Sequence, residues 1–286
     1  MGDYGPDVSL SKAQIPTSPP RHAAEPDEIS VLVTGFGPFK TNLVNASYLI
    51  ASSLPPSFDL STTDATGLVS RRVAIHAHPS PIPVAYSTVR ETIPVILEDY
   101  AKCHGGRRPD IVMHMGIAAM RNFYSVETQA RRDAYHMSDI KGKGGYEDGE
   151  KLWRELGLPA VLQAGPATDP KPTPAESILP SPTEDPLQVQ HPSFTPRPPN
   201  DDLLGLWKSF VPAGTDVRIS DDAGRYLCEF IYYTSLSHAF REGQDRNVVF
   251  FHVPAACGDD AIREGKEAAI ALIKGLIMHW TEGKIE

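Results

Sequence analysis

One cysteine, Cys228, stands where a helix is expected to begin. The segment 219–230 reads Ile-Ser-Asp-Asp-Ala-Gly-Arg-Tyr-Leu-Cys-Glu-Phe, and apolar residues at helical spacing follow it, Leu227, Ile231 and Thr234 among them. Ser220-Asp221-Asp222 are helix-capping residue types. Backbone N–H groups and the helix dipole at such a start favour a thiolate, the nucleophilic form of cysteine. The competing interpretation is a small buried hydrophobe, the commoner role of an isolated cysteine.

A cysteine nucleophile needs a base to take its proton and a third group to orient that base. His252 follows an apolar run, 247–251, and precedes Val-Pro, so it would be held on a rigid turn. His114 lies near the end of another apolar run and stays open as a second candidate base. Glu127 and Asp139 are the candidate orienting acids, although either could be a solvated surface residue. The pattern favours a hydrolase of the cysteine–histidine type.

The elements expected to position these side chains alternate between strand and helix. Strands are predicted at 29–34, 71–76, 110–115, 216–219 and 247–251. Helices are predicted from Asn42 or Asn45 to Leu54, over 83–101 with a bend at Pro94, weakly over 150–156, over the Cys228 segment, and from about 258 to 280. This alternation predicts an α/β fold: three layers, α/β/α, with a mostly parallel central sheet.

Functional groups in open parallel sheets gather beyond the carboxyl ends of the strands. Four unusual stretches follow predicted strands here: 35–39, 114–121, 220–228 and 252–254. We expect them to meet at one edge of the sheet.

The prolines divide the chain unevenly. Residues 1–27 lack apolar periodicity and are predicted to be a disordered tail. Residues 28–286 are expected to form a single catalytic α/β domain. It is interrupted by a proline-rich insertion at 166–199, where eleven prolines lie between Gly165 and Asn200.

Composition excludes several classes of protein. The formal net charge of -9, with no basic run, argues against a nucleic-acid binder. The three cysteines have no metal-binding or disulfide spacing, so we expect neither a disulfide framework nor a zinc site. No signal-peptide or membrane-spanning run is present, which predicts no membrane association and a reducing, cytoplasmic location.

Two segments resemble the pyroglutamyl peptidase I family, the pyrrolidone-carboxylate peptidases. Val33-Thr34-Gly35-Phe36-Gly37-Pro38-Phe39, followed by Val44-Asn45-Ala46-Ser47, is similar to the opening signature of that family. Ser220 to Cys228, with Tyr232-Tyr233-Thr234-Ser235-Leu236, is similar to its nucleophile segment in the animal-like form. The blocks Phe251-His252-Val253-Pro254 and His114-Met115-Gly116, the latter with Glu127 eleven residues after Gly116, resemble those that contain the histidine and the acid.

The resemblance implies a phosphorylase/hydrolase-like fold and removal of an N-terminal 5-oxoproline from peptides through a thioester acyl-enzyme, without metal or cofactor. It implies Cys228 as nucleophile, His252 as base and Glu127 as orienting acid. It also implies that Phe36 and Phe39 enclose the pyrrolidone ring. The full set of implied substrate-binding residues is Phe36, Phe39, Asn45, Gly116, Ile117 and Leu227.

The chain departs from the family pattern at several positions. Ile117 replaces a glutamine of bacterial members, Arg132 replaces an asparagine, Ile140 follows Asp139 in place of asparagine, and the insertion at 166–199 has no counterpart. The alternative function is therefore a catalytically impaired paralogue that acts as a binding or scaffold protein. A nucleoside phosphorylase-like enzyme is disfavoured because no anion-binding loop is visible. Oligomeric state and the preferred residue after pyroglutamate cannot be read from the sequence.

Overall fold

The computed structural model describes residues 28–39, 42–64, 67–167 and 194–281. The predicted tail at 1–27 and most of the predicted insertion at 166–199 lie outside the described residues. Within the described ranges, no helix has the length and apolar character needed to cross a membrane.

The main sheet has seven strands in the order β2-β3-β1-β4-β9-β5-β8. These strands are β1 (Ile29–Gly35), β2 (Ser57–Asp64), β3 (Gly67–Ala77), β4 (Ile111–Ile117), β5 (Tyr124–Glu127), β8 (Val217–Ser220) and β9 (Val248–Val253). A separate two-stranded sheet pairs β6 (Ala130–Arg131) with β7 (Val161–Leu162). β1, β4 and β9 are buried along almost their whole length, and most of their residues are hydrophobic because both faces of these strands are covered.

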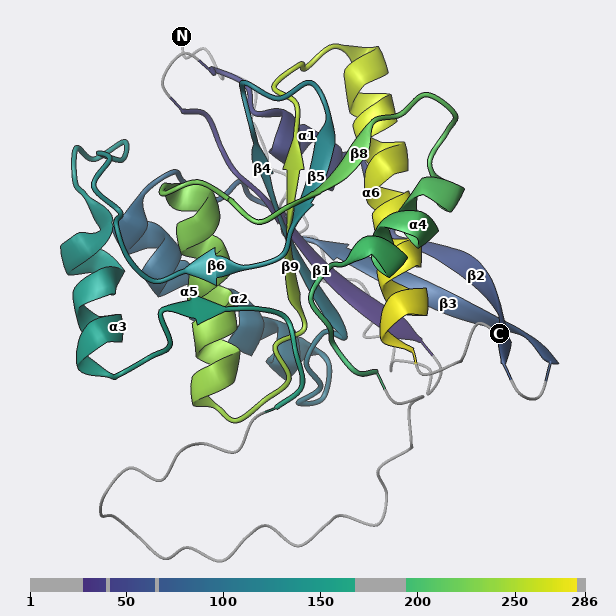
Figure 1. The fold of residues 1–286 in the computed structure, drawn as a ribbon, viewed down its shortest axis with the longest axis horizontal. Coiled ribbons are helices and arrows are strands. Elements are labelled where there is room, and N and C mark those ends of the chain that lie inside the picture. The colour runs from purple at the N-terminus through teal and green to yellow at the C-terminus, as the bar shows by residue number, and fades with distance from the viewer. Residues whose placement is uncertain (1–27, 40–41, 65–66, 168–193, 282–286) are drawn as a thin grey trace, which may run out of the picture.

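Helices cover both faces of the sheet (Figure 1). The helices are α1 (Ala46–Ser53), α2 (Tyr86–Cys103), α3 (Lys151–Glu155), α4 (Asp201–Phe210), α5 (Leu227–Arg241) and α6 (Asp259–Trp280), with a turn of π-helix, η1 (Tyr146–Glu150), before α3. α2, α3 and α5 lie on one side, and α1, α4 and α6 on the other. The predicted α/β/α architecture is confirmed.

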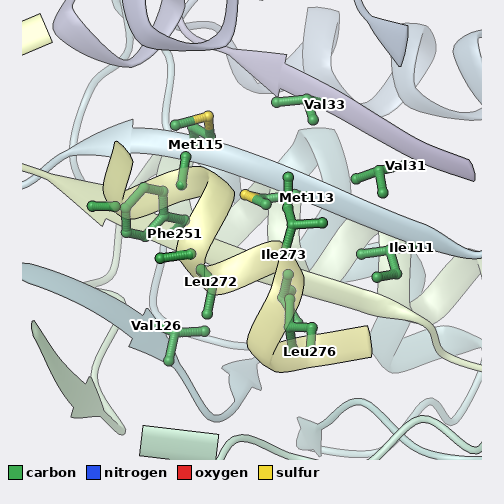
Figure 2. Packing of buried hydrophobic residues seen from close by; sticks show 14 of the residues in the cluster. Val31, Val33, Ile111, Met113, Met115, Val126, Phe251, Leu272, Ile273 and Leu276 are labelled. Carbon is green, nitrogen blue, oxygen red and sulfur yellow. The ribbon is translucent and has the colours of Figure 1, made fainter. Parts of the chain in front are cut away.

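Each face of the sheet has its own hydrophobic core. Figure 2 shows the core beneath α6, where Leu272, Ile273 and Leu276 pack against Met113 and Phe251 of the central strands. The opposite core joins Phe250 to α5 and α2. Buried apolar area of this kind contributes about 25 cal/mol per Å², so the two cores fix the central strands and the helix that contains Cys228 in its first turn.

Strand directions differ from a simple parallel sheet. β3, β1, β4 and β9 are parallel, whereas β5 is antiparallel to β9 and β8 is parallel to β5. Three of the four predicted stretches therefore follow strands that end at one edge. The fourth begins at Ser220, which is level with Glu127 and Phe250, and the 221–226 loop returns the chain to that edge.

Candidate active site

His252 and Glu127 form a buried pair beside the edge where β4 and β9 end. The antiparallel register of β5 and β9 matches Ser125 with His252 and Glu127 with Phe250, so these side chains share one face of the sheet. Nδ1 of His252 lies 2.7 Å from Oε1 of Glu127. His252 is 4% exposed and Glu127 0% exposed, so water competes little for this hydrogen bond.

The protonation of this pair follows from its partners. Burial alone would raise the pKa of Glu127, but its contacts with His252, and then with Ser220 and Arg121, lower that pKa below the usual value. An ionised carboxylate only accepts hydrogen bonds, so Nδ1 of His252 holds the hydrogen and donates it. The lone pair is thereby left on Nε2, which is the state of a base ready to take a proton.

The thiol of Cys228 packs on Gly116, next to His252. Gly116 on β4 is the direct neighbour of His252 on β9 in the parallel register. A Cβ built on Gly116 would lie 2.8 Å from Sγ of Cys228 and 2.8 Å from Cζ of Phe250. A side chain at position 116 would therefore displace the sulfur, and the glycine brings the thiol to the strand beside the imidazole.

Cys228 is the second residue of α5 and is partly buried. The N-cap residue, Tyr226, makes no capping hydrogen bond through its side chain. Among the hydrogen bonds of the described residues, none joins the thiol to His252. Such contacts are often long before substrate binds and shorten in the substrate complex.

The predicted thiolate is not the resting state of Cys228. Burial, and then the negative charge of Glu127, raise the pKa of the thiol to about 12. Arg121 and the backbone N–H of Cys228 itself act in the opposite direction, as expected of a helix start, but the first two effects are larger. The sequence argument considered only the helix terminus and omitted the cost of ionising a thiol away from water.

Of the alternative residues, neither His114 nor Asp139 contacts the His252–Glu127 pair. His114 is 1% exposed and lies between Oγ1 of Thr34 at 2.7 Å and Oγ of Ser235 at 2.6 Å. Asp139 accepts hydrogen bonds from the backbone N–H groups of Tyr86, at the start of α2, and of Lys141 and Lys143. Each is bound to structural partners, which leaves Glu127 as the acid that contacts a candidate base.

The predicted substrate-binding residues differ in their burial and in the face of the sheet on which they lie. Phe39 is partly buried, and its ring lies 5.2 Å from that of Tyr226. Phe36 and Leu227 are buried in the core between the sheet and α5, while Ile117 packs against the core on the other face.

Hydrogen bonds from the side chain of Asn45 stabilise the turn at 35–39. Its Nδ2 donates to the carbonyl of Gly37 at 2.9 Å, and its Oδ1 accepts from the backbone N–H and the hydroxyl of Ser47. The side chain of Asn45 thus acts as the N-cap of α1 and fixes the turn that presents Phe39.

Two residues of the site, Tyr226 and Arg121, were not anticipated from the sequence. Tyr226 occupies an N-cap position where small polar residues predominate, and this mismatch is a signal for a role other than capping. Arg121 donates to Oε1 of Glu127 at 2.9 Å. No sequence signal marks Arg121, because its partner is reached through the pairing of β5 with β9, which was not predicted.

Elsewhere in the described chain, neither the hollow at the other edge of the sheet nor a metal-binding group supplies a second cysteine–histidine site. A hollow of about 340 Å³ lies at the opposite edge of the sheet, lined by Arg108, Asp110 and Asn247 among others, and contains neither cysteine nor histidine. Among the described residues, no group of histidine, cysteine and carboxylate side chains could hold a metal ion.

Comparison with known proteins gives consistent relatives. No family model matches the chain. The chain is 29% identical over 227 residues to pyroglutamyl-peptidase 1 of Mus musculus, covering 79% of this chain and 78% of that protein. It is 25% identical over 226 residues to the pyrrolidone-carboxylate peptidase of Pyrococcus furiosus, covering 79% and 81% of the two chains.

A solved structure shares the fold. A mutant pyrrolidone carboxyl peptidase from Pyrococcus furiosus matches with a TM-score of 0.57 and 20% sequence identity, over 88% of this chain and 99% of that one. The resemblance to the pyroglutamyl peptidase I family is therefore confirmed: the chain is a relative of these peptidases in sequence and has the fold of the pyrrolidone carboxyl peptidases.

Proposed function

We propose that this chain is a cysteine exopeptidase that removes an N-terminal pyroglutamyl (5-oxoproline) residue from peptides, the activity for which its relatives are named. The observation that supports it most is the position of the Cys228 thiol on Gly116, the strand neighbour of His252, which is itself bonded to Glu127. Nucleophile, base and orienting acid are then adjacent, as acyl transfer by cysteine requires.

The raised pKa of Cys228 assigns the first task to His252. Because the thiol is protonated at rest, Nε2 of His252 takes its proton as the sulfur attacks the exocyclic carbonyl carbon of the pyroglutamyl residue. The tetrahedral oxyanion would be stabilised by backbone N–H groups in the first turn of α5, which have no carbonyl partner within the helix.

The proton that His252 has taken is then passed to the leaving group. His252 donates it to the leaving amine as the C–N bond breaks, leaving a thioester on Cys228. Water, deprotonated by His252, then hydrolyses the thioester and releases 5-oxoproline and the thiol. Glu127 stays ionised throughout and holds the imidazole in one tautomer and orientation.

Two aromatic side chains near the nucleophile segment, Phe39 and Tyr226, fit the proposed substrate. Pyroglutamate is an uncharged lactam, so it is best bound by ring faces and a few backbone hydrogen bonds. Phe39 and Tyr226 offer such faces, and Tyr226 is only two residues before Cys228. All three cysteines are free, which fits the reducing, cytoplasmic location included in this proposal.

A chromogenic pyroglutamyl-amide substrate tests the proposal. The wild-type protein should release the amine, and Cys228→Ala should reduce kcat/KM by about 10⁴ or more while melting as the wild type does. Cys257→Ala is the matched control, because Cys257 is also partly buried but bonds only to backbone oxygens of Val44 and Ala255. Equal turnover by Cys228→Ala would place the nucleophile on another residue, and no turnover by the folded wild type would favour a binding protein. Either result would reject the proposal.

A further inference from the structure

Arg121 joins parts of the site that lie on different elements. It belongs to the turn between β4 and β5, where its backbone N–H bonds to the carbonyl of Ala118 at 2.8 Å. Its Nη1 donates to Oε1 of Glu127 at 2.9 Å and to Oγ of Ser125 at 2.7 Å. Its Nη2 donates to the backbone carbonyl of Asp222 at 3.0 Å, in the loop that leads to the nucleophile helix.

The carboxylate of Glu127 depends on these contacts. It is 0% exposed, whereas the side chain of Arg121 is 25% exposed and keeps contact with the surface. Oε2 of Glu127 has no hydrogen-bond partner among the described residues. Oε1 accepts short hydrogen bonds from His252 and Arg121, and a longer one, of 3.4 Å, from Oγ of Ser125. The two short, charge-assisted bonds are the ones that hold this buried carboxylate in place.

We propose that Arg121 is a positioning residue: its guanidinium holds the Glu127 carboxylate against His252 and ties it to the 221–226 loop that leads to Cys228. The planar fork of arginine can bond the carboxylate with one nitrogen and the Asp222 carbonyl with the other. A lysine has one nitrogen and keeps the charge, but it cannot reproduce both bonds in this geometry.

The positive charge of Arg121 also affects the pKa values of the site. Arg121 lowers the pKa of Cys228, against the larger effects of burial and Glu127. It also lowers the pKa of Glu127, with a smaller effect than those of His252 and Ser220. The titratable groups that face this carboxylate and thiol are His252 on β9, Arg121 on the β4–β5 turn, Cys228, Glu229 and Tyr232 on α5, Tyr226 before α5, and Tyr86 on α2. Of these, only Arg121 has a permanent positive charge.

Alkylation of Cys228 by iodoacetamide as a function of pH, measured by mass spectrometry of the peptide that contains Cys228, tests this role. In Arg121→Met the rising part of the pH profile, measured between about pH 7 and pH 10, should move up by about one pH unit, the smallest shift expected when an adjacent opposite charge is lost. The rate near neutral pH then falls about tenfold. Arg121→Lys should stay close to the wild-type profile. If Arg121→Met does not fold, Arg121→Gln replaces it, with the same shift expected.

Arg218→Met is the matched control. The guanidinium carbon of Arg218 lies 3.9 Å from the ring centre of Phe123, which Arg121 also approaches, at 5.8 Å. Arg218 pairs with Asp216 rather than with Glu127. Its removal should leave the alkylation profile unchanged. An unchanged profile in Arg121→Met, or an equal shift in Arg218→Met, would overturn the proposal.

Turnover provides a second readout, which rests on the proposed function. On a pyroglutamyl-amide substrate, Arg121→Met should lower kcat about tenfold with KM within about twofold, because the group acts through Glu127 and not on the substrate. A rise in KM with unchanged kcat would contradict this role. If the wild type shows no peptidase activity but the alkylation profile still shifts, the proposed function fails and the role of Arg121 stands.

Discussion

Two histidines of the same sheet face show what separates a base from a structural residue. His114 lies on β4 and His252 on β9, two neighbouring parallel strands, and both are almost completely buried. His114 contacts two hydroxyl groups, those of Thr34 and Ser235. His252 contacts the carboxylate of Glu127. The two rings differ in the groups that they contact and not in their positions on the strands. For this reason the sequence left both histidines open as candidate bases.

The partners determine the charge that each ring can accept. Burial lowers the pKa of His114 to about 3, because no neighbouring carboxylate compensates for the lost hydration of an imidazolium. His252 has an ionised carboxylate 2.7 Å from Nδ1, which can stabilise a positive ring during the reaction. A proton can therefore be held temporarily on His252 but not on His114.

Replacing each histidine in turn tests the comparison with the largest expected effect. His252→Gln should lower kcat/KM by about 10³–10⁴, because no other described group near the thiol can take its proton. His114→Gln should retain activity within about threefold, since its ring contacts only Thr34 and Ser235. Steady-state kinetics on a pyroglutamyl-amide substrate measures both. Equal losses in the two variants would contradict the assignment of His252 as the base.

Removing only the carboxylate charge sharpens the same comparison. Glu127→Gln keeps the shape of the side chain but gives His252 a neutral partner like those of His114. The expected loss in kcat/KM is about 10²–10⁴, through the wrong tautomer and a less stable imidazolium. The pH–rate profile and a melting curve would separate this from misfolding, and a variant as active as the wild type would show that the ring needs no carboxylate.

A smaller loss is expected from Gly116→Ala, which changes distance but no charge. The new Cβ would lie 2.8 Å from Sγ of Cys228 and from Cζ of Phe250, so the sulfur must move away from the strand that neighbours His252. Misplacement of a reacting atom by about 1 Å can cost about 10²-fold in rate. Comparing kcat with the alkylation rate of Cys228 checks this, with Gly205→Ala as control because a Cβ there contacts nothing within 4 Å.

The last expected effect is on stability in acid and not on the reaction rate. The folded protein holds His114 neutral down to a pKa of about 3, whereas the unfolded chain protonates it near the usual histidine pKa of 6.5. Stability from this group is therefore complete above pH 6.5 and is lost as the pH falls towards 3. Wild type should lose on the order of 3 kcal/mol of unfolding free energy between pH 6.5 and pH 4 from this residue. Urea unfolding of His114→Gln should show a correspondingly shallower loss, and identical slopes would contradict the assignment.

Much of the architecture was predictable because its elements have strong periodicity. The buried strands around Val31, Val112 and Val249 and the long amphipathic helix to Trp280 agree with the predicted ranges. β5 was missed because Tyr124–Glu127 is only four residues long and ends in a charged residue. α4 was also missed, although Asn200 is an N-cap that bonds to the N–H of Leu203.

The chemistry of the site was less predictable than its residue types. Placing Glu127 against His252 requires the antiparallel pairing of β5 with β9, a long-range choice that no local pattern encodes. The protonation state of the Cys228 thiol depends on its burial and on the charges of Glu127 and Arg121. These three residues lie on three separate elements. A helix terminus is visible in sequence, but the surroundings that outweigh it are not.

Trapping the acyl-enzyme tests the central claim most directly. Wild-type protein is mixed with a pyroglutamyl ester or amide, quenched in acid within the first turnovers, digested and analysed by mass spectrometry. The account predicts a pyroglutamyl thioester on the peptide that contains Cys228, absent from those of Cys103 and Cys257, and accumulating less in His252→Gln. Turnover without an acyl group on Cys228, or an acyl group on another residue, would contradict it.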